Sequence, residues 1–198
     1  RNVVTFKGNG LHSGKNTNVK LIPAIENEGI NFKRIDFNEN NVIKADYKNV
    51  SSATLCTTLE NKFGRKVSTV EHLLAALYIC GIDNVPIETD NEEIPILDGS
   101  SKIFINEIKK VGLKNQNVPI KIILIRKKIT YKEDEKFISI EPSKTNLIID
   151  FEIKYKTNFI GKQRNLIDVY NSDLTDVMES RTFCLYEDVE KLKKMGLA

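Results

Sequence analysis

Two adjacent polar residues, Glu71 and His72, are the first candidates for chemistry, because they open a run of residues that is otherwise apolar. A carboxylate can act as a general base, and an imidazole can bind a metal ion or transfer a proton. Each residue also has a structural interpretation. Ser68 and Glu71 have the spacing of a capping box, in which each side chain satisfies the other's backbone donor, and His72 could be a hydrogen-bonded, half-buried side chain. Periodicity alone favours the structural interpretations.

The chain has few residues of the types that bind zinc. It contains two histidines, His12 and His72, and three cysteines at positions 56, 80 and 184. A catalytic zinc ion takes about three protein ligands and a water. A complete histidine-based site is therefore not expected unless carboxylates contribute. The cysteines form no Cys-x-x-Cys pair and are odd in number, which favours a reducing compartment and predicts a cytoplasmic protein.

Two further segments have notable turn chemistry. Residues 8–14, Gly-Asn-Gly-Leu-His-Ser-Gly, place three glycines and two polar side chains in a turn between strands. Such glycines suit close approach to a ligand or an ordinary tight hairpin, and without a following helix the segment is no phosphate loop. Residues 93–101 predict a rigid apolar loop that ends in a turn and a helix N-cap, an interpretation that is purely architectural.

The element that carries Glu71 and His72 is a predicted helix over residues 68–80. Gly81 follows where a helix C-cap belongs. The apolar stripe places His72 on the opposite side of the helix, beside small residues, and the second face is expected to be covered too because the helix is apolar nearly all round. The stripe consists of Val70, Leu73, Leu74, Leu77 and Tyr78. The residues on the opposite side, beside His72, are Ala75, Ala76 and Ile79.

The remaining pattern predicts an α+β fold of two similar domains, each a small sheet layered with helices. The polar segment 112–119 is the best boundary, giving domains at 1–115 and 116–198, the second lacking its C-terminal helices. Strands are predicted at 17–22, 30–35, 84–89, 120–131, 136–141 and 146–155, and further helices at 101–111, 172–179 and 186–194.

Composition excludes several classes of protein. A net charge of +3, from 30 basic and 27 acidic residues, is too small to favour a nucleic-acid binder. The longest apolar runs fall well short of the ~18 to 20 residues that span a bilayer, so no stable membrane insertion is expected. The start of the chain has neither an initiator Met nor an apolar signal core, which predicts a cut N-terminus.

Five motifs together resemble a known family. In order along the chain they are Gly-Leu-His-Ser-Gly (10–14), Ser-Thr-Val-Glu-His-Leu-Leu-Ala-Ala-Leu (68–77), Gly-Ile-Asp-Asn-Val (81–85), Glu-Ile-Pro-Ile-Leu-Asp-Gly-Ser (93–100) and Ser-Arg-Thr-Phe (180–183). Over its whole length the chain resembles the UDP-3-O-acyl-N-acetylglucosamine deacetylases, zinc hydrolases that commit Gram-negative bacteria to lipid A synthesis. This resemblance reverses the preference for structural roles at Glu71 and His72.

The resemblance implies a cytoplasmic enzyme with its zinc site between two α+β domains and an apolar passage for the acyl chain of the substrate. His72 would be a zinc ligand, Glu71 the general base, and Thr182 a hydrogen-bond donor to the tetrahedral oxyanion. The residues implied to lie near the substrate are Leu55, Cys56 and Phe183 at the acyl passage or the zinc, His12 at the reacting end, Leu11 as a further substrate contact, and, by a looser match, Lys136 and Tyr155 at the UDP moiety.

The resemblance also implies that this chain holds only part of the zinc site. The family completes that site with a His-Lys-x-x-Asp helix, and uses a further His as general acid, beyond the residue that matches Ala198. Residues 1–198 by themselves are therefore expected to show no turnover. The expected partner is a UDP-linked acylated amino sugar, with no nucleic acid, and the expected state is a monomer.

Two alternatives have different functions. The first is a non-catalytic binding module of the same fold that has lost the metal site. The second is an RNA-binding α+β domain, which the dispersed lysines and the lack of an aromatic–basic motif disfavour. A reading frame that continues past Ala198 into the missing motif favours the enzyme, and a stop codon favours the binding module.

Overall fold

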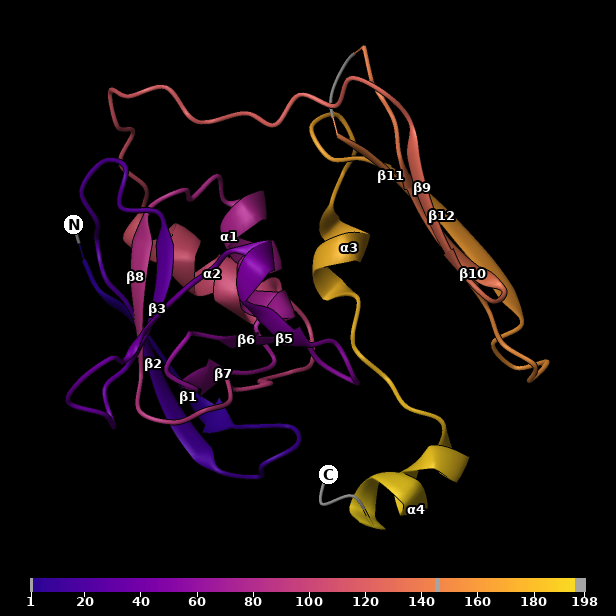
Figure 1. Ribbon diagram of the computed structural model, residues 1–198, viewed down its shortest axis with the longest axis horizontal. Helices are drawn as coiled ribbons and strands as arrows, with labels where there is room; N and C mark the ends of the chain where they lie inside the picture. Colours follow the sequence, from indigo (N-terminus) through magenta and orange to yellow (C-terminus); the bar gives the residue numbers. More distant parts are fainter. Residues whose placement is uncertain (1, 145–146, 195–198) are drawn as a thin grey trace. The chain divides into compact units, whose positions relative to one another are not determined.

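The computed structural model describes residues 2–144 and 147–194. The chain forms two compact units (Figure 1). One runs up to Pro119 and resumes at Val177, and the other comprises Ile120–Asp176. Each unit is described by itself.

A five-stranded sheet forms the frame of the first unit, in the order β1-β2-β8-β3-β4. Neighbouring strands are antiparallel except β3 and β8, which are parallel. Side chains alternate across the sheet, as the period of two predicts, and one face is buried. The strands are β1 (Val4–Asn9), β2 (Asn16–Leu21), β3 (Ile30–Arg34), β4 (Val42–Lys44) and β8 (Val85–Thr89).

Two helices, α1 (Glu71–Ile79) and α2 (Lys102–Val111), lie side by side and pack against the sheet (Figure 1). Leu73 and Leu77 of α1 are fully buried. Phe104 of α2 meets Phe6 of β1 with ring centroids 4.8 Å apart in an edge-to-face arrangement. Each such buried side chain stabilises the fold by about 1.5–3 kcal/mol, so this layer anchors α1 firmly.

A small sheet in the order β5-β6-β7 completes the first unit. Its strands are β5 (Val50–Ser52), β6 (Thr58–Glu60) and β7 (Lys66–Val67), and the short 3-10 helix η1 (Tyr47–Asn49) precedes them. Leu59 and Val67 join the main core. The loop between β5 and β6 carries Leu55 and Cys56.

The end of α1 is confirmed at Gly81. Gly81 has a φ of +67°, its N–H donates to the carbonyl of Tyr78, and the N–H of Ile82 donates to the carbonyl of Leu77. This pair of bonds is a Schellman motif, which requires the left-handed conformation that glycine adopts at little cost.

The predicted faces of α1 need correction. Tyr78, expected in the apolar stripe, is 50% exposed, and Ala75 on the opposite side is exposed as well. Ala76, expected opposite the stripe, is fully buried. The buried stripe is therefore rotated toward Ala76, which belongs to the hydrophobic core together with Leu73 and Leu77. The second face is covered in part, since Ile79 packs against this core while Ala75 stays exposed.

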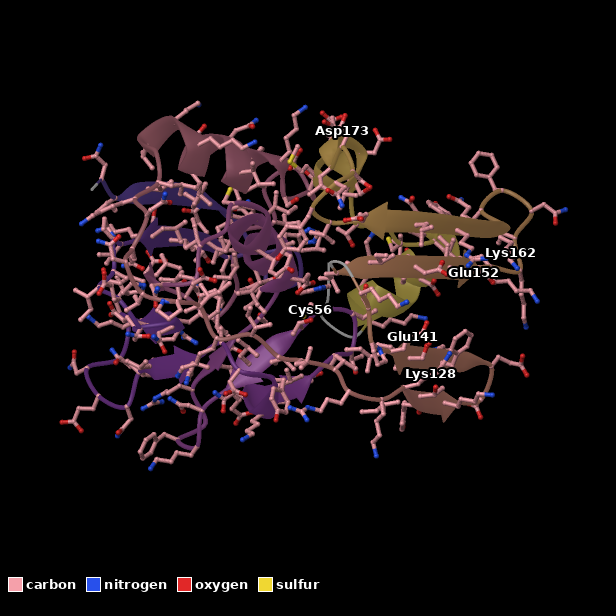
Figure 2. All side chains as sticks on the ribbon, turned by 90° about the horizontal axis from the view of Figure 1, so that it is seen from above. Cys56, Lys128, Glu141, Glu152, Lys162 and Asp173 are labelled. Carbon is pink, nitrogen blue, oxygen red and sulfur yellow. The ribbon has the colours of Figure 1, made fainter. Side chains whose placement is uncertain are left out.

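The second unit consists of two antiparallel hairpins in separate two-stranded sheets. Each hairpin carries an exposed ion pair, Lys128–Glu141 at 2.9 Å and Lys162–Glu152 at 3.1 Å (Figure 2). Exposed pairs of this kind contribute about 0–1 kcal/mol. The strands are β9 (Ile129–Glu133) with β10 (Lys136–Ile140), and β11 (Ile148–Lys154) with β12 (Lys162–Asp168).

Predictions for the second half hold in part. No described residue from 120 to 176 is buried. The layer of helices expected on the sheet of the second domain therefore stays a prediction. The strand predicted from residue 120 is wrong before Ile129, since none of the strands that the structure describes pairs with that run, and β12 was not predicted. The helices observed are α3 (Thr175–Glu179) and α4 (Tyr186–Lys194).

The structure confirms the α+β class. Strand-rich segments and helices alternate in the first unit as the residue pattern predicts. None of the helices within residues 2–144 and 147–194 is both long and apolar enough to cross a bilayer.

Candidate functional site

The start of α1 does not have the predicted capping box. The N-cap position is Val70, and no side chain caps the helix. The N–H of Ser68 donates instead to the carbonyl of Glu92 at 2.8 Å. Thr69 has a φ of +55°, so the chain turns sharply between Ser68 and the helix. The capping-box prediction is wrong because this left-handed residue removes Ser68 from the cap and leaves the carboxylate of Glu71 without that role.

The carboxylate of Glu71 is held by the loop between β5 and β6. Its Oε2 accepts a hydrogen bond from the N–H of Thr57 at 3.1 Å, and the carbonyl of Thr57 lies 3.5 Å from the N–H of Val70. Leu55, with a φ of +65°, is 54% exposed, and Cys56 is half-buried. The structure thus brings Leu55 and Cys56, two predicted substrate contacts, to the loop over the first turn of α1.

A second, buried carboxylate lies close to the same turn. Glu93 is 3% exposed and accepts hydrogen bonds from the N–H of His12 at 3.0 Å, the N–H of Ser13 at 2.7 Å and the hydroxyl of Thr69 at 2.9 Å. Glu93 therefore connects Thr69, two positions before Glu71, to loop 10–14 through hydrogen bonds. That loop carries the predicted contacts Leu11 and His12. Leu11 itself is 38% exposed.

Glu93 remains a carboxylate at neutral pH. Burial by itself raises the pKa of Glu93, but hydrogen bonds from the backbone of His12 and Ser13 and from the hydroxyls of Ser13 and Thr69 outweigh burial, so that the pKa is lower than the ordinary value. The network around Glu93 is thus built for an anion that only accepts hydrogen bonds.

Gly10 is required by the close approach of this carboxylate. A Cβ atom at Gly10 would lie 2.2 Å from Oε2 of Glu93 and 2.5 Å from Oγ of Ser13. Gly10 therefore leaves space for a carboxylate of the same chain. The turn pattern alone allowed two other reasons for this glycine, close approach to a ligand and a tight hairpin.

Replacing Gly10 with Ala is expected to displace Glu93 and to destabilise the first unit by about 1–3 kcal/mol, the usual cost of overpacking. Denaturant unfolding would measure the loss. Gly14→Ala is the matched control, since Gly14 has a φ of +63° but open space around it, and only strain of about 1 kcal/mol is expected there. Equal losses in both variants would contradict the crowding argument.

The loop that follows Glu93 positions Thr182. The N–H of Thr182 donates to the carbonyl of Gly99 at 2.9 Å. Arg181 donates from Nε to the carbonyl of Asp98 at 2.9 Å and places Nη2 3.5 Å from the Asp98 carboxylate. Two motifs about 80 residues apart are therefore joined, and Thr182 lies exposed beside Phe183, which is 55% exposed.

The predicted N-cap of α2 is corrected in detail. Ser101 occupies the N-cap position but makes no side-chain cap bond. The hydroxyl of Ser100 accepts from the N–H of Lys102 at 3.1 Å, while the hydroxyl of Ser101 donates to the carbonyl of Met178 at 3.3 Å. The architectural interpretation of residues 93–101 is confirmed, with Ser100 as the residue that satisfies the helix start.

Two predicted contacts lie in the second unit. Lys136 is the first residue of β10, is exposed and pairs in register with Glu133. Tyr155 directly follows β11, donates its N–H to the carbonyl of Gly161 at 2.8 Å and is 37% exposed. Both residues are accessible to a ligand on that unit.

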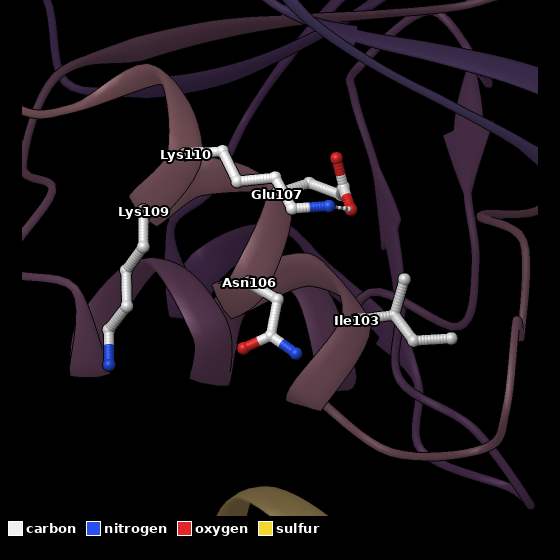
Figure 3. A pocket seen from close by; sticks show the side chains of 5 residues that line it. All are labelled: Ile103, Asn106, Glu107, Lys109 and Lys110. Atoms are coloured by element: carbon white, nitrogen blue, oxygen red, sulfur yellow. Dashed lines mark hydrogen bonds and ion pairs between the residues drawn. The ribbon is translucent and has the colours of Figure 1, made fainter.

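A shallow hollow on α2 is not the candidate site (Figure 3). It offers no imidazole, thiol or hydroxyl for catalysis, and it contains none of the predicted site residues. Its lining consists of Ile103, Asn106, Glu107, Lys109 and Lys110. The hollow is a surface depression between solvated side chains.

The donors present fit part of a zinc site. His72 is half-buried in the first turn of α1, next to Glu71. Both ring nitrogens of His12 are buried and have no hydrogen-bond partner among the described residues. Within those residues no three His, Cys, Asp or Glu side chains gather to hold a metal ion. His72 could thus supply one ligand of a zinc site and Glu71 an adjacent base, and the other ligands would have to come from residues outside this set.

Sequence reasoning missed three residues of this site. Glu93 appeared only as the start of a loop, Thr69 only as an interior position of a motif, and Thr57 not at all. The available signal for Glu93 was an acidic residue directly before a buried apolar loop, Ile94-Pro95. Thr57 acts through its backbone, which leaves no signal in its residue type.

The fold and the site define an α+β protein that presents a carboxylate and an imidazole at consecutive positions in the first turn of a helix packed against the core. Residues 1–198 match the model of the family described as LpxC, UDP-3-O-acyl N-acetylglycosamine deacetylase, and the chain belongs to this family. The resemblance noted from the five motifs is confirmed.

Several curated relatives are named UDP-3-O-acyl-N-acetylglucosamine deacetylase. The protein of Vibrio campbellii is 37% identical over 200 residues, with 100% of this chain and 65% of that protein covered. The proteins of Campylobacter hominis and Haemophilus ducreyi are 38% and 36% identical, with 98% and 100% of this chain and 65% and 66% of those proteins covered. The chain thus spans about 65% of the length of the relatives it matches.

Proposed function

We propose that the full-length protein containing this chain hydrolyses the N-acetyl group of UDP-3-O-acyl-N-acetylglucosamine and releases acetate, in lipid A biosynthesis. Family membership supports this reaction. The observation that carries it is the state of Glu71: its carboxylate is not used as a cap and is fixed through one oxygen by the N–H of Thr57. The binding-module alternative is not favoured, since the relatives are named as deacetylases.

In this reaction His72, Glu71 and Thr182 have different roles. Bound zinc, with His72 as one ligand, would polarise the amide carbonyl and lower the pKa of water. Glu71 takes the proton of the water that attacks the acetyl carbon, and the hydroxyl of Thr182 donates to the developing oxyanion. The carbon–nitrogen bond then breaks, the amine nitrogen takes a proton, and acetate and the free amine are the products.

The proposed substrate contacts fall into groups. Leu55 and Phe183 are exposed apolar side chains suited to the acyl chain, with Cys56 beside Leu55 in sequence. Leu11 and His12 serve the reacting end of the substrate. Lys136 and Tyr155 on the second unit serve the UDP moiety, by charge and by ring stacking. We also propose that the enzyme is a cytoplasmic monomer with domains at 1–115 and 116–198.

Removing zinc from the full-length protein with a chelator is expected to abolish acetate release, and added Zn²⁺ should restore it. His72→Ala should lower both the zinc content per protein and the rate, because it removes a metal ligand. Tyr78→Phe, at an exposed position of the same helix, is the control and should keep both. Acetate release and metal analysis are the measurements.

Two results would contradict the proposal. Full zinc content in His72→Ala would remove His72 from the ligand set. No acetate release by the metal-loaded parent protein, with the UDP-linked substrate present, would overturn the proposed function.

A further inference from the structure

Glu93 is a buried charge that the proposed reaction does not use. At 3% exposure a carboxylate is costly to keep unless it is fully hydrogen-bonded, and here it accepts bonds from His12, Ser13 and Thr69. These partners come from two segments, loop 10–14 and the turn before α1. A group that joins two segments of the site without touching the reacting atoms acts through the geometry it imposes.

Thr69 is the strained partner of Glu93. It is β-branched, 2% exposed and has a φ of +55°, a conformation that costs free energy for such a side chain. Its hydroxyl donates to Oε1 of Glu93 at 2.9 Å. Strain of this kind persists only where surrounding contacts over-determine the conformation, and the bond to Glu93 is the side-chain contact that does so.

The alternative to the strained state is the capping box encoded in residues 68–71. With an ordinary negative φ at Thr69, Ser68 would reach the N-cap position and Glu71 would bond back to the backbone of Ser68. In the structure Ser68 pairs with the carbonyl of Glu92, and Glu71 accepts from Thr57 instead. The conformation of Thr69 therefore decides whether Glu71 serves the helix or remains available to a substrate.

We propose that Glu93 is a positioning residue for the deacetylation: by holding Thr69 in the left-handed conformation and loop 10–14 against it, Glu93 keeps Glu71 out of a capping box and sets His12 beside the start of α1. This inference rests on the proposed function. Glu93 itself contacts neither substrate nor metal in this role.

The test uses the full-length, zinc-loaded enzyme. Glu93→Gln keeps the shape but turns an amide donor toward a backbone N–H or the Thr69 hydroxyl, so one bond of the network is lost. We expect kcat to fall by ~10- to 100-fold, the usual cost of losing a partner that orients a site, with KM and zinc content little changed. Glu92→Gln, the adjacent exposed carboxylate, is the matched control and should keep the parent kcat.

A second pair of variants tests the hydrogen bond between the Thr69 hydroxyl and Glu93 by itself. Thr69→Val removes the hydroxyl and keeps the shape, whereas Thr69→Ser keeps the hydroxyl. We expect Thr69→Val to lower kcat as Glu93→Gln does and Thr69→Ser to retain most of the parent kcat. This pair tests the proposal even if Glu93→Gln fails to fold.

Amide hydrogen exchange gives a readout independent of turnover. Exchange at His12 and Ser13 should be faster in Glu93→Gln and unchanged in Glu92→Gln. Lowered melting temperatures at parent kcat, or an equal loss of kcat in Thr69→Val and Thr69→Ser, would overturn the positioning role. A parent enzyme that releases no acetate would instead overturn the proposed function, and with it any role of Glu93 in that reaction.

Discussion

Glu71→Gln in the full-length protein is expected to lower kcat by ~10² to 10⁴, the usual cost of losing a general base, while zinc remains bound. Glutamine keeps the size of glutamate, and its carbonyl oxygen can still accept the N–H of Thr57, which lies 3.1 Å from Oε2 of Glu71. It cannot take a proton from the attacking water. Because Glu71 is not a cap in the structure, little stability should be lost. Steady-state kinetics, metal analysis and a thermal melt measure the three quantities.

The control for this variant is Glu107→Gln on α2, which removes an exposed i,i+3 ion pair with Lys110. That change should affect neither rate nor zinc content, and stability by less than about 1 kcal/mol. Near-normal turnover in Glu71→Gln together with a lower melting temperature would show that Glu71 has a structural role after all.

Thr182→Val is expected to lower kcat by ~10² to 10³, about 3–4 kcal/mol of transition-state stabilisation, with little change in KM. A hydroxyl aimed at a developing oxyanion matters more in the transition state than in the bound substrate. The structure also separates this role from folding. Thr182 lies between the end of α3 at Glu179 and the start of α4 at Tyr186, so it caps neither helix.

The fold should tolerate this substitution, since the bond that Thr182 makes to the carbonyl of Gly99 comes from its backbone N–H, which valine retains. Thr182→Ser keeps the hydroxyl and should recover most of the rate. A normal kcat in Thr182→Val would remove Thr182 from the catalytic residues.

Local patterns were sufficient for the elements that position the site. The i, i+3, i+7 spacing of buried Val70, Leu73 and Leu77 predicted α1, and Gly81 predicted its end, because a helix period and a left-handed C-terminal residue depend on neighbours in sequence. Alternation predicted β2, β3 and β8 to within one residue at each end. The same reasoning failed at residues 120–125, since an apolar run becomes a strand only when another strand pairs with it.

The types and order of the candidate residues, including Glu71, His72 and Thr182, together with the family, were determined by the sequence alone. Only the tertiary structure decided what Glu71 does at the helix start. Ser68 and Glu71 satisfy every local rule for a capping box, and the competing contact comes from Glu93, 24 residues beyond Thr69 and 81 beyond His12. A buried carboxylate with three donors outweighs one cap, because leaving such a charge unpaired costs far more than the ~1 kcal/mol that a cap contributes.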